Sequence, residues 1–250
     1  LNDLSTFATN RPFVLCIGGF DPSAGAGILA DIKMAECSGC YGLAAISCNT
    51  IQTHDSFQSL IPTALSVLQD QIKKLLDTYP VKAIKIGLIP HLDWLTAILR
   101  LVNPNSSLPV VWDPVLSASA GFDFHRDHKG FSLPRGIQLI TPNWEEAKRL
   151  SGMENPIPWA KTSNVAVLIK GGHRDSNLVT DLLFEPEQKQ MEFSDEWVKS
   201  GEKHGSGCML STAIACQLAL GKTVQEACRE AKTLVRERLA SNPSLLAHYF

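Results

Sequence analysis

The sequence predicts an α/β protein with a mainly parallel sheet covered by helices on both faces. Two observations support this fold class. The strand-like segments, such as residues 13–19 and 165–169, are apolar throughout instead of alternating, which is typical of parallel strands buried on both faces. Amphipathic helical segments separate successive strands, and helices in those connections form a layer on each side of the sheet. Because no repeat or linker interrupts the pattern, we expect one three-layer α/β domain spanning residues 1–250.

The expected elements follow one another along the whole chain. In order, they are a strand at 13–19, a helix at Ile28–Glu36, a strand at 42–48, a helix at Thr63–Tyr79, a strand at 81–87, a helix at Leu92–Val102, strands at 109–114 and 137–143, a helix at Glu145–Ser151, a strand at 165–172, a hairpin at 178–193, and helices at Cys208–Leu220 and Val224–Ala240. The irregular stretch at 117–136 is long enough to predict a functional loop.

Composition narrows the class of function. Hydrophobic residues make up 44% of the chain and charged residues 19%, as in ordinary soluble enzymes. The net charge of -2 argues against binding to nucleic acid or to an anionic membrane surface. We see no apolar run of about 18 residues that would span a membrane, and no secretory signal in residues 1–12.

Cysteine usage favours reduced thiols in a cytoplasmic protein. There are seven cysteines, an odd number, and several lie inside apolar segments. Cys37 and Cys40 have the C-x-x-C spacing of redox and zinc sites, but they fall at the end of a predicted helix that Gly39 would cap. We therefore expect an ordinary helix end there.

Polar residues follow several of the predicted strands directly. Residues 20–27 follow the first strand, and Asp113 follows the apolar segment at 109–112. Asn143 and Glu146 follow the next strand, and Lys170 follows the segment at 165–169. The carboxyl ends of parallel strands share one edge of the sheet, where ligands bind in such folds. The sequence therefore predicts a ligand site at this edge.

Two nucleotide-like motifs are weak. "GAGILA" at 25–30 fits the dinucleotide fingerprint, but its strand has already ended at Gly19 and no acidic residue follows at the required distance. We expect these glycines to bring the backbone close to a small substrate, or to form a plain tight loop. "LGKT" at 220–223 lacks the earlier glycine of a P-loop, so Gly221 is interpreted as a helix C-cap.

The stretch "HGSGC" at 204–208 opens a long apolar helix. Gly205, Ser206 and Gly207 can turn the chain so that free amides at the helix N-terminus attract a phosphate. The same setting is expected to lower the pKa of Cys208, which would make this thiol a base or partly a thiolate. A buried structural cysteine under a glycine turn is the alternative.

Five segments together resemble a known family. "GGFDPSAGAGILADIK", "DPVL", "LITPNWEEA", "LIKGGH" and "HGSGCMLSTAIA" occur in the order and near the spacing of the hydroxymethylpyrimidine and phosphomethylpyrimidine kinases of thiamine biosynthesis. These enzymes belong to the ribokinase-like superfamily, and the similarity runs from about Cys16 to Ala240. It implies a mainly parallel sheet flanked by helices, usually in a homodimer.

The resemblance also implies roles for individual residues. The anion hole matches Gly205, Ser206 and Gly207, and the family's proposed catalytic base matches Cys208, which would take the proton of a hydroxymethyl group as it attacks the γ-phosphate of ATP. The other matches are Lys170 beside the phosphates, Asn143 and Glu146 organising Mg²⁺ and phosphates, and Asp113 near the metal. Asn143 and Glu146 could also be an ordinary helix-capping pair.

The pyrimidine side of the site is matched less directly. The resemblance places Gln52 against the pyrimidine ring, where an amide can both donate and accept, although an exposed strand-end residue is the alternative. The rest of that pocket would consist of Gly19, Asp21, Ala26, Leu88 and Val115. The chain departs from the family pattern at Ser206, which replaces a threonine, and at "SNPSLLAHYF", which replaces a glycine-rich closing segment near the nucleotide.

These observations leave three functional hypotheses. The first is ATP-dependent phosphorylation of 4-amino-5-hydroxymethyl-2-methylpyrimidine and of its monophosphate. The second is pyridoxal or pyridoxine kinase activity, because that substrate also carries a hydroxymethyl group on a flat heteroaromatic ring. The third, of a different class, is a catalytically weak pyrimidine-binding protein.

Overall fold

The computed structural model describes residues 11–102, 108–117, 122–125, 130–171, 178–186, 189–198 and 203–249. Its elements are β1 (Phe13–Phe20), α1 (Gly27–Cys37), β2 (Tyr41–Gln52), β3 (Phe57–Pro62), α2 (Leu65–Thr78), β4 (Val81–Ile86), α3 (Asp93–Val102), β5 (Val110–Trp112), β6 (Leu139–Ile140), α4 (Trp144–Ser151), α5 (Ile157–Thr162), β7 (Ala166–Ile169), β8 (Leu178–Glu185), β9 (Lys189–Glu196), α6 (Ser206–Ala219) and α7 (Val224–Leu239).

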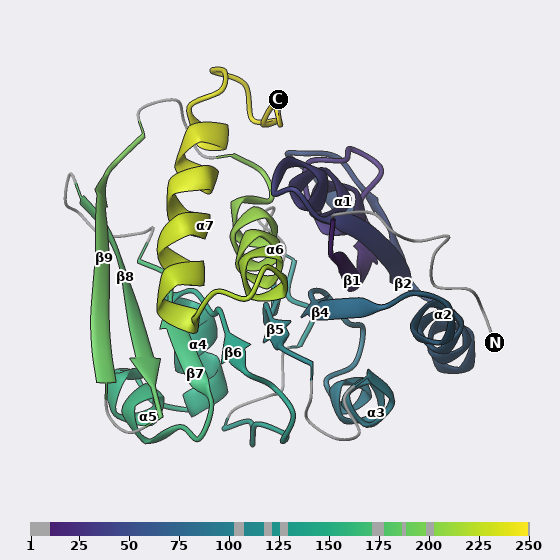
Figure 1. The fold of residues 1–250 in the computed structure, drawn as a ribbon, viewed down its shortest axis with the longest axis horizontal. Helices are drawn as coiled ribbons and strands as arrows, with labels where there is room; N and C mark the ends of the chain where they lie inside the picture. The colour runs from purple at the N-terminus through teal and green to yellow at the C-terminus, as the bar shows by residue number, and fades with distance from the viewer. Residues whose placement is uncertain are drawn as a thin grey trace.

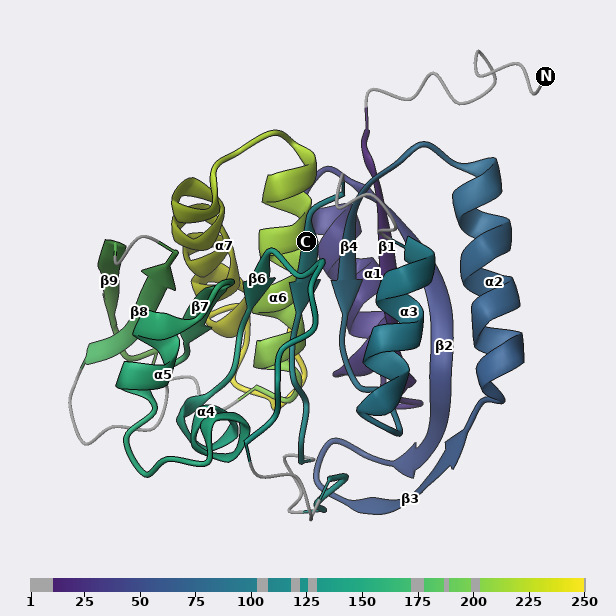
Figure 2. The same cartoon turned by 90° about the horizontal axis from the view of Figure 1, so that it is seen from below.

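The strands form one nine-stranded sheet in the order β3-β2-β1-β4-β5-β6-β7-β8-β9 (Figure 1; β3 is labelled in Figure 2). From β2 to β7 every neighbouring pair is parallel, whereas β3, β8 and β9 run antiparallel to their neighbours. The predicted parallel core and the hairpin at its end are therefore both confirmed. The carboxyl ends of β1, β4, β5, β6 and β7 lie along one edge of the sheet.

Helices cover both faces of this sheet, as Figures 1 and 2 show. On one face α2, α3, α4 and α5 contribute to a large apolar cluster, and on the other α1, α6 and α7 contribute to a second. Strand β1 serves both, because Leu15 and Ile17 belong to the first cluster while Val14 and Cys16 belong to the second. This double burial explains why the strand is apolar throughout.

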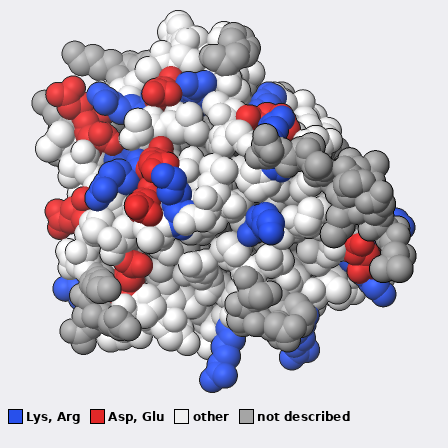
Figure 3. Space-filling model, viewed as in Figure 1, with Lys and Arg blue, Asp and Glu red and all other residues white. Residues whose placement is uncertain are grey.

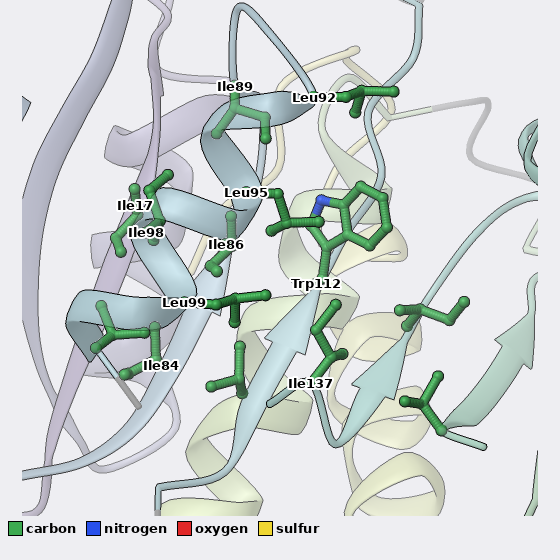
Figure 4. Close-up of a cluster of buried hydrophobic side chains, with 14 of the residues drawn as sticks. Ile17, Ile84, Ile86, Ile89, Leu92, Leu95, Ile98, Leu99, Trp112 and Ile137 are labelled. Carbon is green, nitrogen blue, oxygen red and sulfur yellow. The ribbon is translucent and has the colours of Figure 1, made fainter. Parts of the chain in front are cut away.

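The cluster beneath α3 is centred on Trp112, whose side chain is fully buried (Figure 4). Leu95 and Leu99 from α3 and Ile86 from β4 lie around it in the close-up. Burying side chains of this size contributes roughly 1.5–3 kcal/mol each, so the packing holds β4 and β5 in place and with them the residues that follow these strands.

Four local predictions need correction. Strand β2 extends to Gln52, beyond the predicted end at 48, and continues into β3, which was not predicted. Helix α2 consequently begins at Leu65 instead of Thr63, and the short helix α5 was also missed. Both missed elements are brief, and β3 pairs with β2 alone at the sheet edge, so its partly exposed residues lack the apolar pattern of the central strands.

The C-x-x-C segment forms a helix end, as expected. Helix α1 ends at Cys37 with Ser38 as its C-cap, Gly39 follows with a positive φ of 75°, and both cysteines are free thiols.

On the face of the molecule that carries α1, α6 and α7, acidic and basic side chains are interspersed (Figure 3). In the described part of the chain, no helix has the length and apolar character needed to cross a membrane.

Candidate active site

The predicted convergence at the sheet edge is present in the structure. Asp113, directly after β5, is 2% exposed and accepts hydrogen bonds from Lys170 Nζ at 2.9 Å and Thr141 Oγ1 at 3.2 Å. These three residues follow three neighbouring strands. Burial alone would raise the pKa of Asp113, but Lys170 and Lys85 outweigh it and hold the pKa below its usual value. The carboxylate is therefore ionised next to a charged lysine.

Asn143 and Glu146 form a capping box at the start of α4. The Asn143 side chain accepts from the Glu146 amide at 2.8 Å, and Glu146 Oε2 accepts from the Asn143 amide at 2.7 Å. The same Glu146 oxygen lies 4.0 Å from Lys170 Nζ. Burial, opposed by Lys170 and reinforced by Asp113, raises the pKa of Glu146 to about 7. The capping interpretation is thus confirmed, and the same pair lies beside Lys170.

The N-terminus of α6 lies against this charged group. Helix α6 begins at Ser206 after Gly205, and no side chain caps it in the described residues. A Cβ at Gly207 would lie 3.1 Å from Lys170 Nζ and 3.7 Å from Asp113 Oδ2, while Ser211 Oγ donates to Asp113 at 3.3 Å. Uncapped amides at a helix N-terminus bind anions, and here a lysine ammonium lies next to them.

Gly205 joins α6 to the glycine-rich loop after β1. Its φ is 81°, and a Cβ at this position would lie 2.1 Å from the carbonyl oxygen of Gly25 and 2.8 Å from the Cα of Ala26. Only glycine combines a left-handed backbone with an approach this close. The loop at 25–27 therefore lies directly against the N-terminal end of α6.

Cys208 is partly buried in the first turn of α6, and the expectation that its pKa is lowered there is wrong. Burial and the carboxylates Asp31 and Asp113 raise the pKa of the thiol to about 11, although Lys85 and a hydrogen bond from the Gly27 amide lower it in part. The helix N-terminus was expected to dominate, but removal of the sulfur from water has the larger effect. At neutral pH Cys208 is therefore a thiol.

Asp21 organises the loop after β1. It is 1% exposed, and its carboxylate accepts from the Ser23 amide and hydroxyl, from the Ala26 amide and from His204 Nε2, all at 2.8–2.9 Å. Burial would raise the pKa of Asp21, but these hydrogen bonds, led by that of His204, lower it below the usual value. Both Asp21 oxygens therefore accept hydrogen bonds from groups of the same chain, and they hold the loop after β1 in place.

The other expected pocket residues fall into separate groups. A Cβ at Gly19 would lie 3.1 Å from Leu88 Cδ2, so these two are neighbours, and Val115 lies two residues after Asp113 with its amide bonded to the Asp113 carbonyl at 2.8 Å. Gln52 is half-buried at the end of β2, where it pairs with Phe57 of β3. None of the hydrogen bonds found among the described residues ties Gln52 to the rest of this set.

The segment at 241–249 packs on the same loops. Lys203 is 4% exposed, and its ammonium donates to Asn242 Oδ1 at 3.2 Å and to the carbonyls of Asn242 and Ser244. The backbone amide of His204 donates to the Leu245 carbonyl at 2.9 Å. A Cβ at Gly25 would lie 2.7 Å from Leu246 Cδ2. This segment, which differs from the family's glycine-rich one, therefore supports the loop that precedes α6. Gly172 and His173 of the "LIKGGH" motif lie outside the described residues.

Sequence interpretation missed two buried charged residues and His204. Lys85 in β4 and Asp31 in α1 are almost fully buried and form an ion pair at 2.8 Å. The available signal was a charged residue inside an apolar strand and another inside an apolar helix face, because such residues are rarely buried unless they are paired. His204 stood within a quoted motif, but its partner Asp21 is 183 positions away.

The donor set fits Mg²⁺. No group of three or more His, Cys, Asp or Glu side chains that could hold a metal by itself occurs among the described residues. Magnesium ions in nucleotide sites are held by one or two carboxylates, by waters and by the phosphates, and Asp113 and Glu146 supply two hard oxygen donors near Lys170. The fit is thus to a metal brought with a nucleotide.

Phosphoryl transfer depends on positioning and on stabilising charge at the transferred group. The open end of α6 and Lys170 provide positive potential, and the loop at 25–27 provides a close backbone wall. The fold and this site together define a phosphotransferase of the ribokinase-like type.

Comparison with known proteins assigns the family. The phosphomethylpyrimidine kinase family model matches residues 21–249, and the chain belongs to this family. A hydroxymethylpyrimidine/phosphomethylpyrimidine kinase of Bacillus subtilis is 31% identical, with 89% of this chain and 87% of that protein covered. The thiamine biosynthesis multifunctional protein of Corynebacterium glutamicum is 28% identical, and the chain spans about 30% of its length.

Solved structures agree in fold. Pyridoxal kinase from Staphylococcus aureus, in complex with AMP-PCP and pyridoxal, has a TM-score of 0.80 at 26% identity, with 93% of this chain and 89% of that chain covered. Phosphomethylpyrimidine kinase from Clostridium difficile has a TM-score of 0.74 at 26% identity, with coverages of 91% and 99%. The expected ribokinase-like fold is confirmed.

Proposed function

We propose that the chain transfers the γ-phosphoryl group of ATP to 4-amino-5-hydroxymethyl-2-methylpyrimidine and then to the resulting monophosphate, as a step of thiamine biosynthesis. The observation that carries this proposal is the close approach of α6 to Lys170: a Cβ added at Gly207 would lie 3.1 Å from Lys170 Nζ. It puts the free helix amides and an ammonium on one side of the space where a phosphate would sit. The membership of the family and the kinases similar to the chain support the substrate class.

In this mechanism the substrate oxygen forms a bond to the γ-phosphorus, and the bond from that phosphorus to the β-bridging oxygen breaks, so that ADP leaves. Lys170 and the amides of Gly207 and Cys208 stabilise charge on the transferred group. Asp113 and Glu146 would hold Mg²⁺, which neutralises phosphate charge when it is bound. The pyrimidine pocket would be lined by Gln52, Gly19, Ala26, Leu88 and Val115. Asp21 would hold the loop after β1 that forms one side of this pocket.

Cys208 would accept the proton of the substrate hydroxyl. A thiol with a pKa of about 11 must first lose its own proton, which costs about 5 kcal/mol at pH 7. In a loose transition state the attacking oxygen contributes little bonding, so positioning carries most of the catalysis. We therefore infer that Cys208 accepts the proton only when ATP and the substrate are bound. Contacts with these ligands would then determine the ionisation of the thiol.

Pyridoxal phosphorylation is the second candidate, because pyridoxal kinases are among the structures most similar to the chain. Incubation of the protein with ATP, Mg²⁺ and, in separate reactions, the hydroxymethylpyrimidine, its monophosphate or pyridoxal tests both proposals by product mass. Mono- and diphosphate from the pyrimidine support the first, and product from pyridoxal alone supports the second. No product from any substrate would favour a pyrimidine-binding protein and overturn both.

Further properties belong to the same proposal. We infer one catalytic domain over the whole chain, a homodimer and a cytoplasmic location, with no nucleic-acid or membrane partner. Light scattering at several protein concentrations tests the dimer, and a monomer at all of them would contradict it.

A further inference from the structure

A fully buried ion pair lies beneath the start of α6. Lys85 Nζ of β4 donates to both carboxylate oxygens of Asp31 in α1, at 2.9 and 2.8 Å, and their side chains are 1% and 0% exposed. A Cβ at Gly87 would lie 2.6 Å from Lys85 Nζ, so the chain leaves space for the ammonium. Buried pairs often stabilise a fold no more than apolar residues of similar size would. Stability alone therefore does not account for this pair.

The pair is tied to the helix that carries Cys208. Thr212 Oγ1 donates to Asp31 Oδ1 at 2.8 Å, and Thr212 is fully buried in the second turn of α6. Cys208 is four residues earlier, so it lies on the same face of the helix, one turn nearer the N-terminus. Ser211, three residues after Cys208, donates to Asp113 in the same way. Thr212 and Ser211 thus join one face of α6 to a fully buried Lys–Asp pair and to the partly buried pair of Lys170 with Asp113, and Cys208 lies on the same face.

Several charged or titratable groups interact electrostatically with Cys208. They are Lys85 of β4, Asp31 of α1, Asp113 after β5, Lys170 after β7, Cys16 of β1 and Tyr249 near the end of the chain. Among the charged groups, Lys85 has the largest effect on the thiol and favours the thiolate, whereas Asp31 opposes it. The two members of the pair therefore act on Cys208 with opposite signs.

We propose that Lys85 and Asp31 are positioning residues for Cys208: the buried pair holds the first two turns of α6 through Thr212 and sets the charge that the sulfur meets. The proposal rests on the proposed function in one respect, namely that Cys208 accepts the hydroxyl proton. Neither residue touches the substrate space; both act through the cysteine and its helix.

The test compares two substitutions that both break the pair but leave opposite charges. In a Cys37→Ser background, which removes the other partly buried thiol, the rate of Cys208 alkylation by iodoacetamide is followed against pH by peptide mass spectrometry. Asp31→Asn leaves the ammonium and is expected to lower the midpoint of the profile, giving about tenfold faster alkylation at pH 9. Lys85→Met leaves the carboxylate and is expected to slow alkylation about tenfold at the same pH.

The opposite signs separate an electrostatic effect from simple loosening of the fold. Loosening would raise the plateau rate in both variants, whereas a charge effect moves the midpoint in opposite directions. Lys232→Met is the matched control, because it breaks a Lys–Asp pair of 2.7 Å between α7 and β8 and is expected to leave the midpoint unchanged. Midpoints that move in the same direction in both variants, or that stay in place, would overturn the proposal.

Two features keep the test decisive. If circular dichroism shows that Lys85→Met does not fold, Asp31→Asn alone decides, and an unmoved or raised midpoint refutes the proposal. Alkylation needs no substrate, so its result is independent of the kinase assay. If Cys208→Ala retained full kinase activity, the proton-accepting role would be lost, while the measured link between the ion pair and the thiol would remain.

Discussion

The contact between Gly205 and the loop after β1 predicts that two glycines of similar conformation respond very differently to alanine. Gly205 has φ 81° and Gly221 has φ 86°, so Gly205→Ala and Gly221→Ala share the same backbone penalty, about 1–2 kcal/mol. At Gly221 the added Cβ meets nothing within 4 Å. At Gly205 it would lie 2.1 Å from the Gly25 carbonyl oxygen, about 1 Å inside the closest ordinary contact.

The difference between the two variants measures this contact. Overpacking against backbone costs typically 1–3 kcal/mol, so we expect Gly221→Ala to lower the free energy of unfolding by about 1–2 kcal/mol and Gly205→Ala by about 2–5 kcal/mol. Urea denaturation measures both. Phosphoryl transfer is expected to fall at least tenfold in Gly205→Ala and to be retained in Gly221→Ala, because only the former separates α6 from the loop. Equal losses of stability and unchanged turnover in both variants would refute the close approach.

Three further predictions concern residues of the same site. In Gly207→Ala the free energy of unfolding is expected to stay the same or rise by up to about 1 kcal/mol, because alanine favours a helix. The added Cβ would crowd Lys170 Nζ at 3.1 Å, so kcat is expected to fall about tenfold. Urea denaturation measures the stability and steady-state kinetics the kcat, and an unchanged kcat would contradict the prediction. Cys208→Ala is expected to lower kcat about 100-fold with the fold intact, measured by turnover and circular dichroism; near-normal turnover would leave the cysteine as packing. Asp21 has a lowered pKa when folded, so its stabilisation is present above its unfolded pKa of about 4 and is lost as pH falls through the folded pKa. In Asp21→Asn, urea midpoints followed against pH are expected to lie lower at neutral pH and to fall less steeply below about pH 4; curves parallel to those of the parent protein would exclude this contribution.

The sheet, and much of the polar edge formed by the carboxyl ends of its parallel strands, were predictable from local patterns. Apolar segments such as β1 and β7 show their double burial in every residue, and the shared direction of β5, β6 and β7 puts Asp113, Asn143 and Lys170 at the same edge. The capping spacing of Asn143 and Glu146 is also local, which is why helix α4 begins where the sequence predicted, to within a residue.

The chemistry of the site depends on residues that no local pattern connects. Asp21 is bonded to His204, 183 positions away, and Asp31 to Thr212, 181 positions away. The pKa of Cys208 depends on such contacts. The local sequence indicated a helix N-terminus, which would lower the pKa, whereas burial of the sulfur raises the pKa to about 11.

By itself, then, the sequence determined the layered fold, the polar edge and the family, because hydrophobic periodicity and motif spacing are properties of neighbouring residues. The tertiary structure alone decided which charges share a dry space, how closely Gly205 meets the loop at 25–27, and whether the thiol is ionised. Those outcomes depend on distance and on exclusion of water, and both are established only when α1, β4 and α6 pack together.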